Sequence, residues 1–305
     1  MIKLIALDLD GTLLNPRGQI TQGAKEAIAK ARAAGVRVVL NTGRPVPEAI
    51  HFSREAGCDD LVSCLGGAAI AHTGTEKVLH RWDIPHDSGL EALALCLNRE
   101  IELMIFAGPE ILLDPFSKAS LERTYPFPVF HKSVVVVDDP LAYMKEQGLP
   151  LTKLHGDWNP DNYPLAELAE LEGVELTRSN DRDFELIPKD MDKGHALAEL
   201  ARRYGISLAD CAAVGDSDND LGMLRVVGHP IAMGNAKDSI KAMAVRVVGD
   251  NAHDGVAEAI LSCLELRDGG APYGTTDSAD RAGPTINPQI LHRGGLWTPP
   301  VRQSP

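Results

Sequence analysis

The segment Leu4-Ile5-Ala6-Leu7-Asp8-Leu9-Asp10-Gly11-Thr12 decides the fold of this chain. Its apolar run is too short for a helix and stands beside turn residues, which predicts a buried parallel strand. The strand delivers Asp8 and Asp10 at its C-terminal end, where open α/β sheets bind their ligands. Residues two apart in an extended segment point to the same side, and Gly11 lets the chain turn sharply after them.

This pair of carboxylates suits two kinds of chemistry. They can bind a divalent cation through oxygen, or serve as a nucleophile and its acid/base partner, and both roles can be combined. A lone Asp-x-Asp is more simply explained as two aspartates that cap the following turn. Three further motifs, in a consistent order downstream, favour a functional site.

Composition narrows the class of protein. The chain has 305 residues, five cysteines and a formal net charge of −13. Its length suggests two domains, and so acidic a chain is expected to bind neither nucleic acid nor a membrane. Widely spaced cysteines without a Cys-x-x-Cys pair indicate reduced thiols and argue against a zinc site. With no signal-like region and no membrane-spanning stretch, we expect a soluble cytoplasmic protein.

The alternation of helices and strands predicts the domain organisation. Residues 1–82 and 189–266 alternate regularly and predict one α/β domain. Residues 83–188 form a mixed series, which we interpret as an inserted α+β domain. Its expected strands are Leu103–Phe106, Val134–Val137, Lys153–His155 and Val174–Thr177, and its expected helices lie near Leu90–Asn98 and Leu165–Leu171. Residues 267–305 are rich in Gly, Pro, Ser and Thr, and we expect a disordered tail there. In the α/β part we expect strands at Val36–Leu40, Leu61–Cys64, Cys211–Val214 and Pro230–Met233, a hairpin of Ala68–His72 with Lys77–Arg81, and helices after Thr21 and over Lys193–Tyr204.

A second motif follows the expected strand Val36–Leu40. Asn41-Thr42-Gly43-Arg44-Pro45 places a hydroxyl, a flexible glycine and a guanidinium at a strand end, with Pro45 starting a helix. This pattern is typical of an anion-binding turn. Taken alone, the pentapeptide is more simply explained as an ordinary strand-to-helix connection with an exposed arginine.

The C-terminal half supplies two more motifs, Asp192-Lys193-Gly194 and Gly215-Asp216-Ser217-Asp218-Asn219-Asp220. If the strands before Asp8 and Asp216 are neighbours, their carboxylates converge on one cation site. Asp220, four residues on, is placed for a supporting role. Crowded carboxylates repel, so magnesium and Lys193 are expected to neutralise them. An acidic helix N-terminus explains any one of these aspartates but hardly all of them.

Together the motifs resemble those of the haloacid dehalogenase-like (HAD) phosphohydrolases, and within them the Cof-type sugar-phosphatase group. Asp-x-Asp-Gly-Thr, Thr-Gly-Arg-Pro, Lys-Gly and Gly-Asp-x-x-Asn-Asp occur in the family's order, over about residues 1–265. The resemblance implies a Rossmann-like parallel-sheet core. It also implies an inserted α+β cap of the C2 (type IIB) kind, which covers the active site and selects the substrate.

The resemblance also implies roles for individual residues. Asp8 would be the nucleophile that forms an aspartyl-phosphate, and Asp10 would protonate the leaving oxygen and then activate water. Lys193 would be the third catalytic residue and would also bind the phosphoryl group. The other residues expected on the phosphate are Thr42, Gly43, Arg44 and Asn219.

The implied cofactor is Mg²⁺. Its expected ligands are the Asp8 carboxylate, the Asp10 backbone carbonyl and Asp216, while Asn219 and Asp220 would support the site and orient Lys193. One departure from the family concerns substrate preference. Gly66-Gly67 stands where relatives commonly have Asn-Gly, so a polar contact expected there is missing.

Three functions are compatible with these motifs. The leading hypothesis is a magnesium-dependent phosphatase acting on small phosphorylated metabolites, with sugar phosphates as the expected class. A phosphomutase of hexose phosphates would use the same nucleophile but return the phosphoryl group to the sugar. A non-catalytic phosphometabolite-binding protein would typically have lost Asp8 or Asp10, and both are present. The sequence does not indicate an oligomeric state.

Overall fold

The structure, a computed structural model, describes residues 1–97, 99–157, 159–178 and 182–267. Apart from Arg267, the predicted tail 267–305 lies outside the described residues. Among the residues described, there is no helix of the length and hydrophobicity needed to cross a bilayer.

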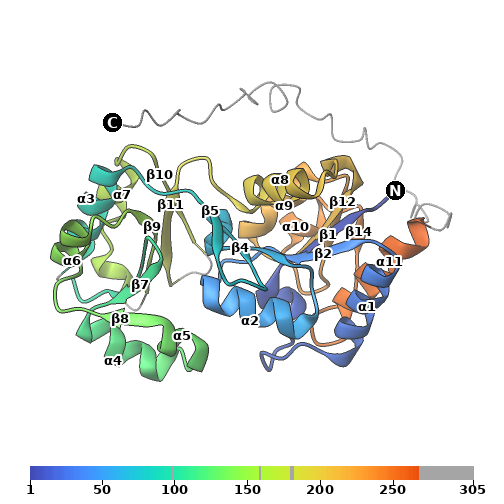
Figure 1. Cartoon of the computed structure of the whole chain (residues 1–305), viewed down its shortest axis with the longest axis horizontal. Coiled ribbons are helices and arrows are strands. Elements are labelled where there is room, and N and C mark those ends of the chain that lie inside the picture. Colours follow the sequence, from blue (N-terminus) through green and yellow to red (C-terminus); the bar gives the residue numbers. More distant parts are fainter. Residues whose placement is uncertain (98, 158, 179–181, 268–305) are drawn as a thin grey trace. The chain divides into compact units, whose positions relative to one another are not determined.

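The first sheet has five parallel strands in the order β14-β13-β12-β1-β2 (Figure 1). Strand β1 lies between β12 and β2, and all four of its residues are buried, as expected for a central parallel strand. Because parallel strands end at the same edge, the residues after β1, β2 and β12 meet there. The strands are β1 (Leu4–Leu7), β2 (Arg37–Leu40), β12 (Cys211–Gly215), β13 (His229–Ala232) and β14 (Arg246–Val247).

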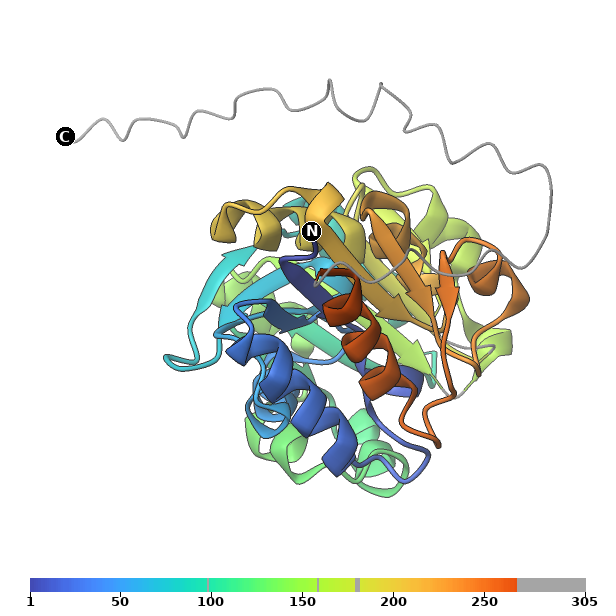
Figure 2. The ribbon, with the colours of Figure 1, turned by 90° about the vertical axis from the view of Figure 1, so that its right-hand side faces the viewer.

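Helices pack on this sheet as the amphipathic patterns predict. Figure 2 shows α1 (Gln22–Ala33) beside α11 (Gly255–Arg267). The hydroxyl of Thr21 caps α1 by accepting the Ala24 N–H at 3.1 Å, as predicted. Helix α8 contacts α9, which also packs on β12 and β13. The helices of this part are completed by α2 (Val46–Ala56), α8 (Lys193–Tyr204), α9 (Leu221–Val226) and α10 (Asp238–Lys241).

The expected hairpin forms, and the strand before it pairs with the hairpin instead of joining the parallel sheet. Strand β3 (Leu61–Cys64) pairs antiparallel with β4 (Ala69–His72), which pairs with β5 (Val78–Arg81) in a separate three-stranded sheet. An isolated parallel bridge from Asn41 to Ser63 links β3 with the end of β2. The tight turn at Leu65–Gly67 reverses the chain and so ends the parallel series.

A second, six-stranded sheet has the order β10-β11-β9-β6-β7-β8 and is antiparallel except for the pair β7 and β8. It has its own apolar core, as an α+β insertion requires. Strands β7 and β11 and helices α4 to α6 add to those expected from the sequence. The strands are β6 (Glu102–Ala107), β7 (Glu110–Leu113), β8 (Val134–Val136), β9 (Leu151–Asp157), β10 (Val174–Thr177) and β11 (Phe184–Pro188). The helices are α3 (His86–Cys96), α4 (Pro115–Thr124), α5 (Pro128–Ser133), α6 (Pro140–Gln147) and α7 (Leu165–Ala169).

The domain boundaries at 82/83 and 188/189 stay a prediction, since Met1–Gly270 form one compact unit.

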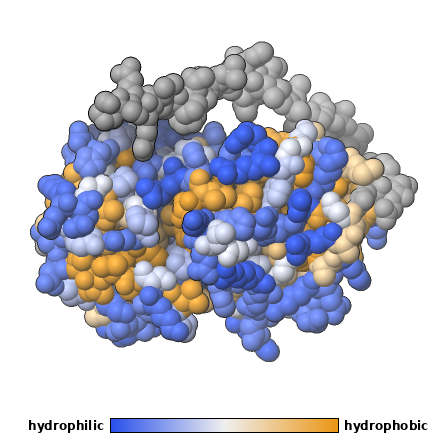
Figure 3. Space-filling model, viewed as in Figure 1, coloured by the Kyte–Doolittle hydropathy of each residue, from blue (hydrophilic) through white to orange (hydrophobic). Residues whose placement is uncertain are grey.

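Two edge strands leave apolar side chains at the surface. Figure 3 shows hydrophobic colour over the regions of β5 and β8, where Leu79 is 40% and Val136 is 47% exposed. Both strands are short, at four and three residues. Short edges offer few unpaired backbone groups to another chain, which limits edge-to-edge association.

Gly67 is the tightest point of the turn after β3. Gly66 and Gly67 both have positive φ, at +73° and +105°, but only at Gly67 would an added Cβ meet close neighbours. A Cβ on Gly67 would lie 2.2 Å from the carbonyl oxygen of Asp192, whereas one on Gly66 would have no neighbour within 4 Å. Asp192 precedes α8, so this turn packs directly against the start of that helix.

We expect Gly67→Ala to lower the free energy of unfolding by about 3 kcal/mol, because left-handed strain and overpacking add together. Gly66→Ala carries only the backbone strain and should cost about 1 kcal/mol. Urea denaturation of the two variants measures the difference. Equal losses of stability would contradict the packing of Gly67 on Asp192.

Candidate active site

Asp8 and Asp10 line one pocket, although the chain does not stay extended between them. Strand β1 ends at Leu7, and the chain turns within Leu9–Leu13, where Asp10 and Gly11 have non-helical backbone angles and Gly11 has φ +82°. The sharp turn expected at Gly11 is confirmed. The two side chains differ in environment, since that of Asp8 is 6% exposed and that of Asp10 is 53% exposed.

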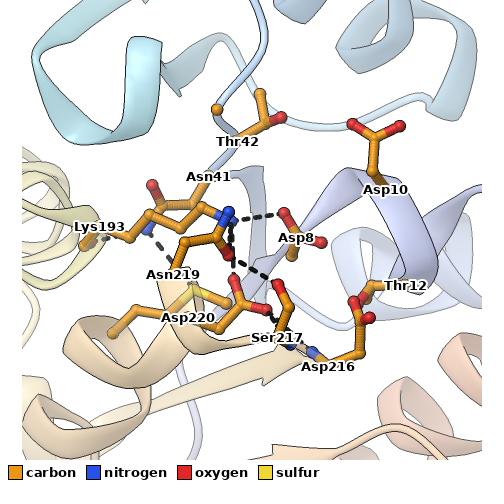
Figure 4. Close-up of polar contacts among 12 residues, drawn as sticks. Asp8, Asp10, Thr12, Asn41, Thr42, Lys193, Asp216, Ser217, Asn219 and Asp220 are labelled. Atoms are coloured by element: carbon orange, nitrogen blue, oxygen red, sulfur yellow. Dashed lines mark hydrogen bonds and ion pairs between the residues drawn. The ribbon is translucent and has the colours of Figure 1, made fainter. Parts of the chain in front are cut away.

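The Lys193 ammonium connects the two halves of the site (Figure 4). Its Nζ donates to Asp8 Oδ1 at 2.6 Å, to Asp220 Oδ1 at 2.7 Å and to Asn219 Oδ1 at 3.3 Å. The Lys193 side chain is 1% exposed. Burial alone would lower its pKa, but the carboxylates of Asp220 and Asp8 raise the pKa above the ordinary lysine value. The lysine therefore stays charged inside the protein.

Two neighbouring groups fix the position of Lys193. Helix α8 begins at this residue, and the Asp192 side chain caps it by accepting the His195 N–H at 2.8 Å. At the end of β2, Asn41 Nδ2 donates to the Lys193 carbonyl oxygen at 2.8 Å. The lysine is thus held by its own helix and by the strand that carries the second motif.

Asp220 organises the turn that follows β12. Its Oδ2 accepts the backbone N–H groups of Asp216 and Ser217 at 2.9 and 3.0 Å, while its Oδ1 accepts from Lys193. The Ser217 hydroxyl donates to Asn219 Oδ1 at 2.8 Å. Asp220 is fully buried, so these bonds compensate the burial of its charge. The turn and the lysine are consequently held by the same carboxylate.

Three carboxylates converge beside the lysine. Oxygens of Asp8, Asp216 and Asp220 lie within 4.8 Å of one another. Burial and the charge of Asp220 raise the pKa of Asp8 well above its ordinary value, and the same two causes raise the pKa of Asp216 to about 6. One lysine therefore does not balance the negative charge of this cluster.

The donor set suits a hard divalent cation, which prefers carboxylate oxygens and would favour their ionised forms. Asp220 already uses both oxygens, so Asp8 and Asp216 are better placed as ligands. A Cβ on Gly11 would lie 2.4 Å from Asp216 Oδ2, so the glycine is what allows this close approach. The third carboxylate of this cluster of side chains is that of Asp220. The ligand role of the Asp10 backbone carbonyl stays a prediction.

The carboxylate of Asp10 is bound by Arg44. Arg44 Nε and Nη2 donate to its two oxygens at 2.8 and 2.7 Å, a bidentate pair. Arg44 Nη1 donates to Glu48 Oε2 at 2.6 Å and to the Tyr125 hydroxyl at 2.5 Å. The ring of Phe127 lies 4.4 Å from the guanidinium carbon. The Nε, Nη1 and Nη2 atoms of Arg44 thus all donate to protein groups. The binding of phosphate by Arg44 stays a prediction.

The other residues of the second motif lie at the same place. Thr42 is fully buried, and its Oγ1 accepts the Arg44 N–H at 3.1 Å. Gly43 lines the pocket, and its carbonyl oxygen accepts from Lys153 Nζ at 3.3 Å. The structure therefore brings every predicted site residue to the edge of the first sheet, while their roles stay predictions.

Several residues of the site were missed by sequence analysis. Glu48 follows Arg44 by one helical turn, and that spacing is a signal that was available. Tyr125, Lys153 and Glu185 come from the second sheet and its helices, and no local pattern marks them. The pocket has a volume of about 680 Å³ and is bordered by both sheets.

Comparison with known proteins identifies the family. The sequence model of the haloacid dehalogenase-like hydrolase family matches residues 5–260 of this chain. The chain belongs to the haloacid dehalogenase-like hydrolases. Phosphatase YwpJ of Bacillus subtilis is 29% identical over 293 residues, which cover 86% of this chain and all of the relative. The 5-amino-6-(5-phospho-D-ribitylamino)uracil phosphatase YwtE of the same species is 31% identical, with 84% and 96% covered.

Solved HAD structures share the fold. A haloacid dehalogenase-like hydrolase from B. subtilis has a TM-score of 0.74 at 26% identity, covering 85% of this chain and 99% of that one. A HAD subclass IIB sugar phosphatase has a TM-score of 0.72 at 22% identity, with 85% and 98% covered. The predicted α/β HAD fold with a type IIB cap is confirmed. So is the expectation of a phosphoric monoester hydrolase, at the level of the family.

The raised pKa of Asp216 has a consequence for stability. An aspartate in the unfolded chain titrates near pH 4, whereas Asp216 in the folded protein titrates at about 6. Between these values the folded state binds more protons, so the metal-free protein loses stability as the pH rises. We expect Asp216→Asn, in EDTA above about pH 6, to be more stable than wild type by about 1–3 kcal/mol.

Urea unfolding at several pH values measures this effect, and the advantage of the variant should disappear near pH 4. Asp218→Asn is the matched control, because Asp218 is exposed and pairs only at the surface with Lys237. It should change stability by less than about 0.5 kcal/mol. A destabilised Asp216→Asn protein at pH 7.5 would contradict the charge imbalance.

Proposed function

We propose that this HAD hydrolase is a magnesium-dependent phosphatase of small phosphorylated metabolites, with sugar phosphates as the expected class. The observation that carries the proposal is the buried Lys193 ammonium between Asp8 and Asp220, with Asp216 beside them and a pocket in front. Phosphoryl transfer needs a positioned nucleophile and neutralised charge, and this arrangement supplies both.

In the proposed reaction Asp8 attacks phosphorus, and the bond from phosphorus to the leaving oxygen breaks. Asp10 gives its proton to that oxygen and later accepts one from the water that hydrolyses the aspartyl-phosphate. Lys193 stays charged throughout and balances the phosphoryl oxygens. A bound Mg²⁺, held by Asp8 and Asp216, would supply the remaining positive charge. Thr42, Gly43 and Asn219 would contact the phosphoryl group.

The contacts of Arg44 support a positioning role for it. Its bidentate pair with Asp10 fixes the direction of that carboxylate, and its bonds to Glu48 and Tyr125 fix the guanidinium in turn. Tyr125 belongs to the predicted cap. The acid/base residue is therefore tied to both parts of the chain.

The named relatives favour hydrolysis over the phosphomutase alternative. YwtE and the pyridoxal phosphate phosphatase YbhA of Escherichia coli, which is 29% identical with 86% of this chain and 98% of the relative covered, are both named phosphatases. Their names support small phosphorylated metabolites as substrates. The cytoplasmic location and the lack of a nucleic-acid partner stay predictions.

Asp8→Asn is expected to abolish phosphate release while leaving the fold intact, because the amide cannot act as nucleophile. The measurement is phosphate release from sugar phosphates, nucleotides and p-nitrophenyl phosphate with Mg²⁺, and circular dichroism checks folding. A loss of at least about 10³-fold is expected. Normal turnover by a folded Asp8→Asn protein would refute the mechanism, and isomerisation of a hexose phosphate without release would favour the mutase.

Removal of metal tests the carboxylate cluster. Wild-type activity should disappear in EDTA and return with excess Mg²⁺, because the charge of Asp8 and Asp216 needs a cation. Asp216→Asn should need a higher Mg²⁺ concentration for half-maximal activity. Asp218→Asn is the control and should follow wild type. Activity indifferent to both EDTA and Mg²⁺ would remove the metal from the proposal.

A further inference from the structure

The pocket has a second wall, formed by one face of the six-stranded sheet. Every second residue of β6 from Glu102 to Phe106 lines the pocket, and so do their register partners on β9, which run from Asp157 to Lys153. Alternate residues of a strand and directly paired residues of neighbouring strands share one face. This face therefore borders the space in which the non-phosphate part of a substrate must lie.

Carboxylates outnumber cations on this wall. Among the described residues that line it, the cationic side chains are Lys153 and Arg182, and His155 Nδ1 lies 3.6 Å from Glu185 Oε1. The carboxylates are Glu102, Asp157, Asp183 and Glu185. Glu102 and Asp157 stand directly opposite each other in the register, and such like-charged pairs destabilise a sheet. A ligand that donates hydrogen bonds would find acceptors on this wall.

The charge of Lys153 is already balanced within the protein. Its Nζ lies 2.6 Å from Glu185 Oε1 and 3.3 Å from the Gly43 carbonyl oxygen, and its side chain is 2% exposed. Burial would raise the pKa of Glu185, yet the charge of Lys153 and a hydrogen bond with the His155 side chain hold the pKa below the ordinary value. Glu185 is thus ionised and compensates the lysine. A second anion on a substrate would find no surplus of positive charge at Lys153.

We propose that this wall makes the enzyme select its substrates by the charge of their leaving group. It accepts phosphate esters whose leaving group is a neutral polyhydroxyl or an amine-bearing group, and it rejects those whose leaving group carries a second anion. Hydroxyl and ammonium groups donate hydrogen bonds to carboxylates, whereas a carboxylate or second phosphate meets like charge in a confined pocket. The proposal rests on the proposed phosphatase function and narrows its substrate class.

The test uses three esters that share one carbon skeleton and differ in charge. Glucose 6-phosphate has a neutral leaving group, glucosamine 6-phosphate an ammonium and 6-phosphogluconate a carboxylate. With Mg²⁺ at pH 7, kcat/KM for 6-phosphogluconate should be at least about tenfold below that for glucose 6-phosphate. Glucosamine 6-phosphate should be used at least as well as glucose 6-phosphate.

Glu102→Gln tests the wall itself, because the amide keeps the shape and the acceptor that Thr124 Oγ1 contacts. The ratio of kcat/KM for glucose 6-phosphate to that for 6-phosphogluconate should shrink at least about threefold. Asp157→Asn alters the partner carboxylate and should shift the ratio in the same direction. Glu175→Gln is the matched control, since Glu175 is an exposed residue of the same sheet that does not line the pocket.

The outcomes separate this inference from the proposed function. If wild type hydrolyses p-nitrophenyl phosphate but uses the anionic and neutral sugars equally, the charge selection is refuted and the phosphatase stands. A ratio unchanged in both Glu102→Gln and Asp157→Asn, or equally changed in Glu175→Gln, also refutes it. If wild type releases phosphate from none of these esters, the proposed function fails and this inference fails with it.

Discussion

A single buried ammonium holds the site together. Lys193 Nζ joins Asp8, which follows the first strand, to Asp220, which belongs to the turn after β12. These residues are 185 and 27 positions away from the lysine along the chain. Removing the lysine would leave two buried carboxylates without their cation, and such losses typically cost about 3–5 kcal/mol. The same contacts that stabilise this fold therefore set the direction of the Asp8 carboxylate, the proposed nucleophile.

The carboxylates of Asp8, Asp216 and Asp220 outnumber the one Lys193 ammonium beside them. Asp216 and Asp8 have raised pKa values because burial and Asp220 oppose their ionisation. A protein selected only for stability would avoid such crowding, and its persistence at a pocket is typical of functional sites. The second wall repeats this pattern with Glu102 opposite Asp157. Both groups of carboxylates border the same pocket.

Sequence analysis predicted the parts of the fold that depend on local pattern. The bounds of β1, β3 and α8 were predicted without error, because apolar runs and caps define them. The pairing of β3 was missed, since it depends on the reversal at Leu65–Gly67. Strands β7 and β11 were missed because they gain their burial from neighbours distant in sequence.

The residues of the candidate site were likewise predictable only where they belong to local sequence motifs. Motif residues were found because each stands at a strand or helix end, where parallel strands bring them together. Arg44 was expected on phosphate, but its bidentate partner in the structure is Asp10. That pairing depends on Glu48 and Tyr125, and Tyr125 comes from a distant segment. The wall of the second sheet has no motif, so only the register shows that its residues share a face.

The place of β1 in its sheet has a consequence for synthesis. Its partner β2 follows within about 40 residues, but its other partner, β12, begins only at Cys211. At roughly 5–20 residues per second, a ribosome needs about 10–40 s to make the intervening chain. During that time an entirely apolar strand has one unpaired edge, which is the kind of surface that aggregates or recruits chaperones. The Asp8 carboxylate, the proposed nucleophile, likewise acquires its counter-ion Lys193 only after most of the protein has been synthesised.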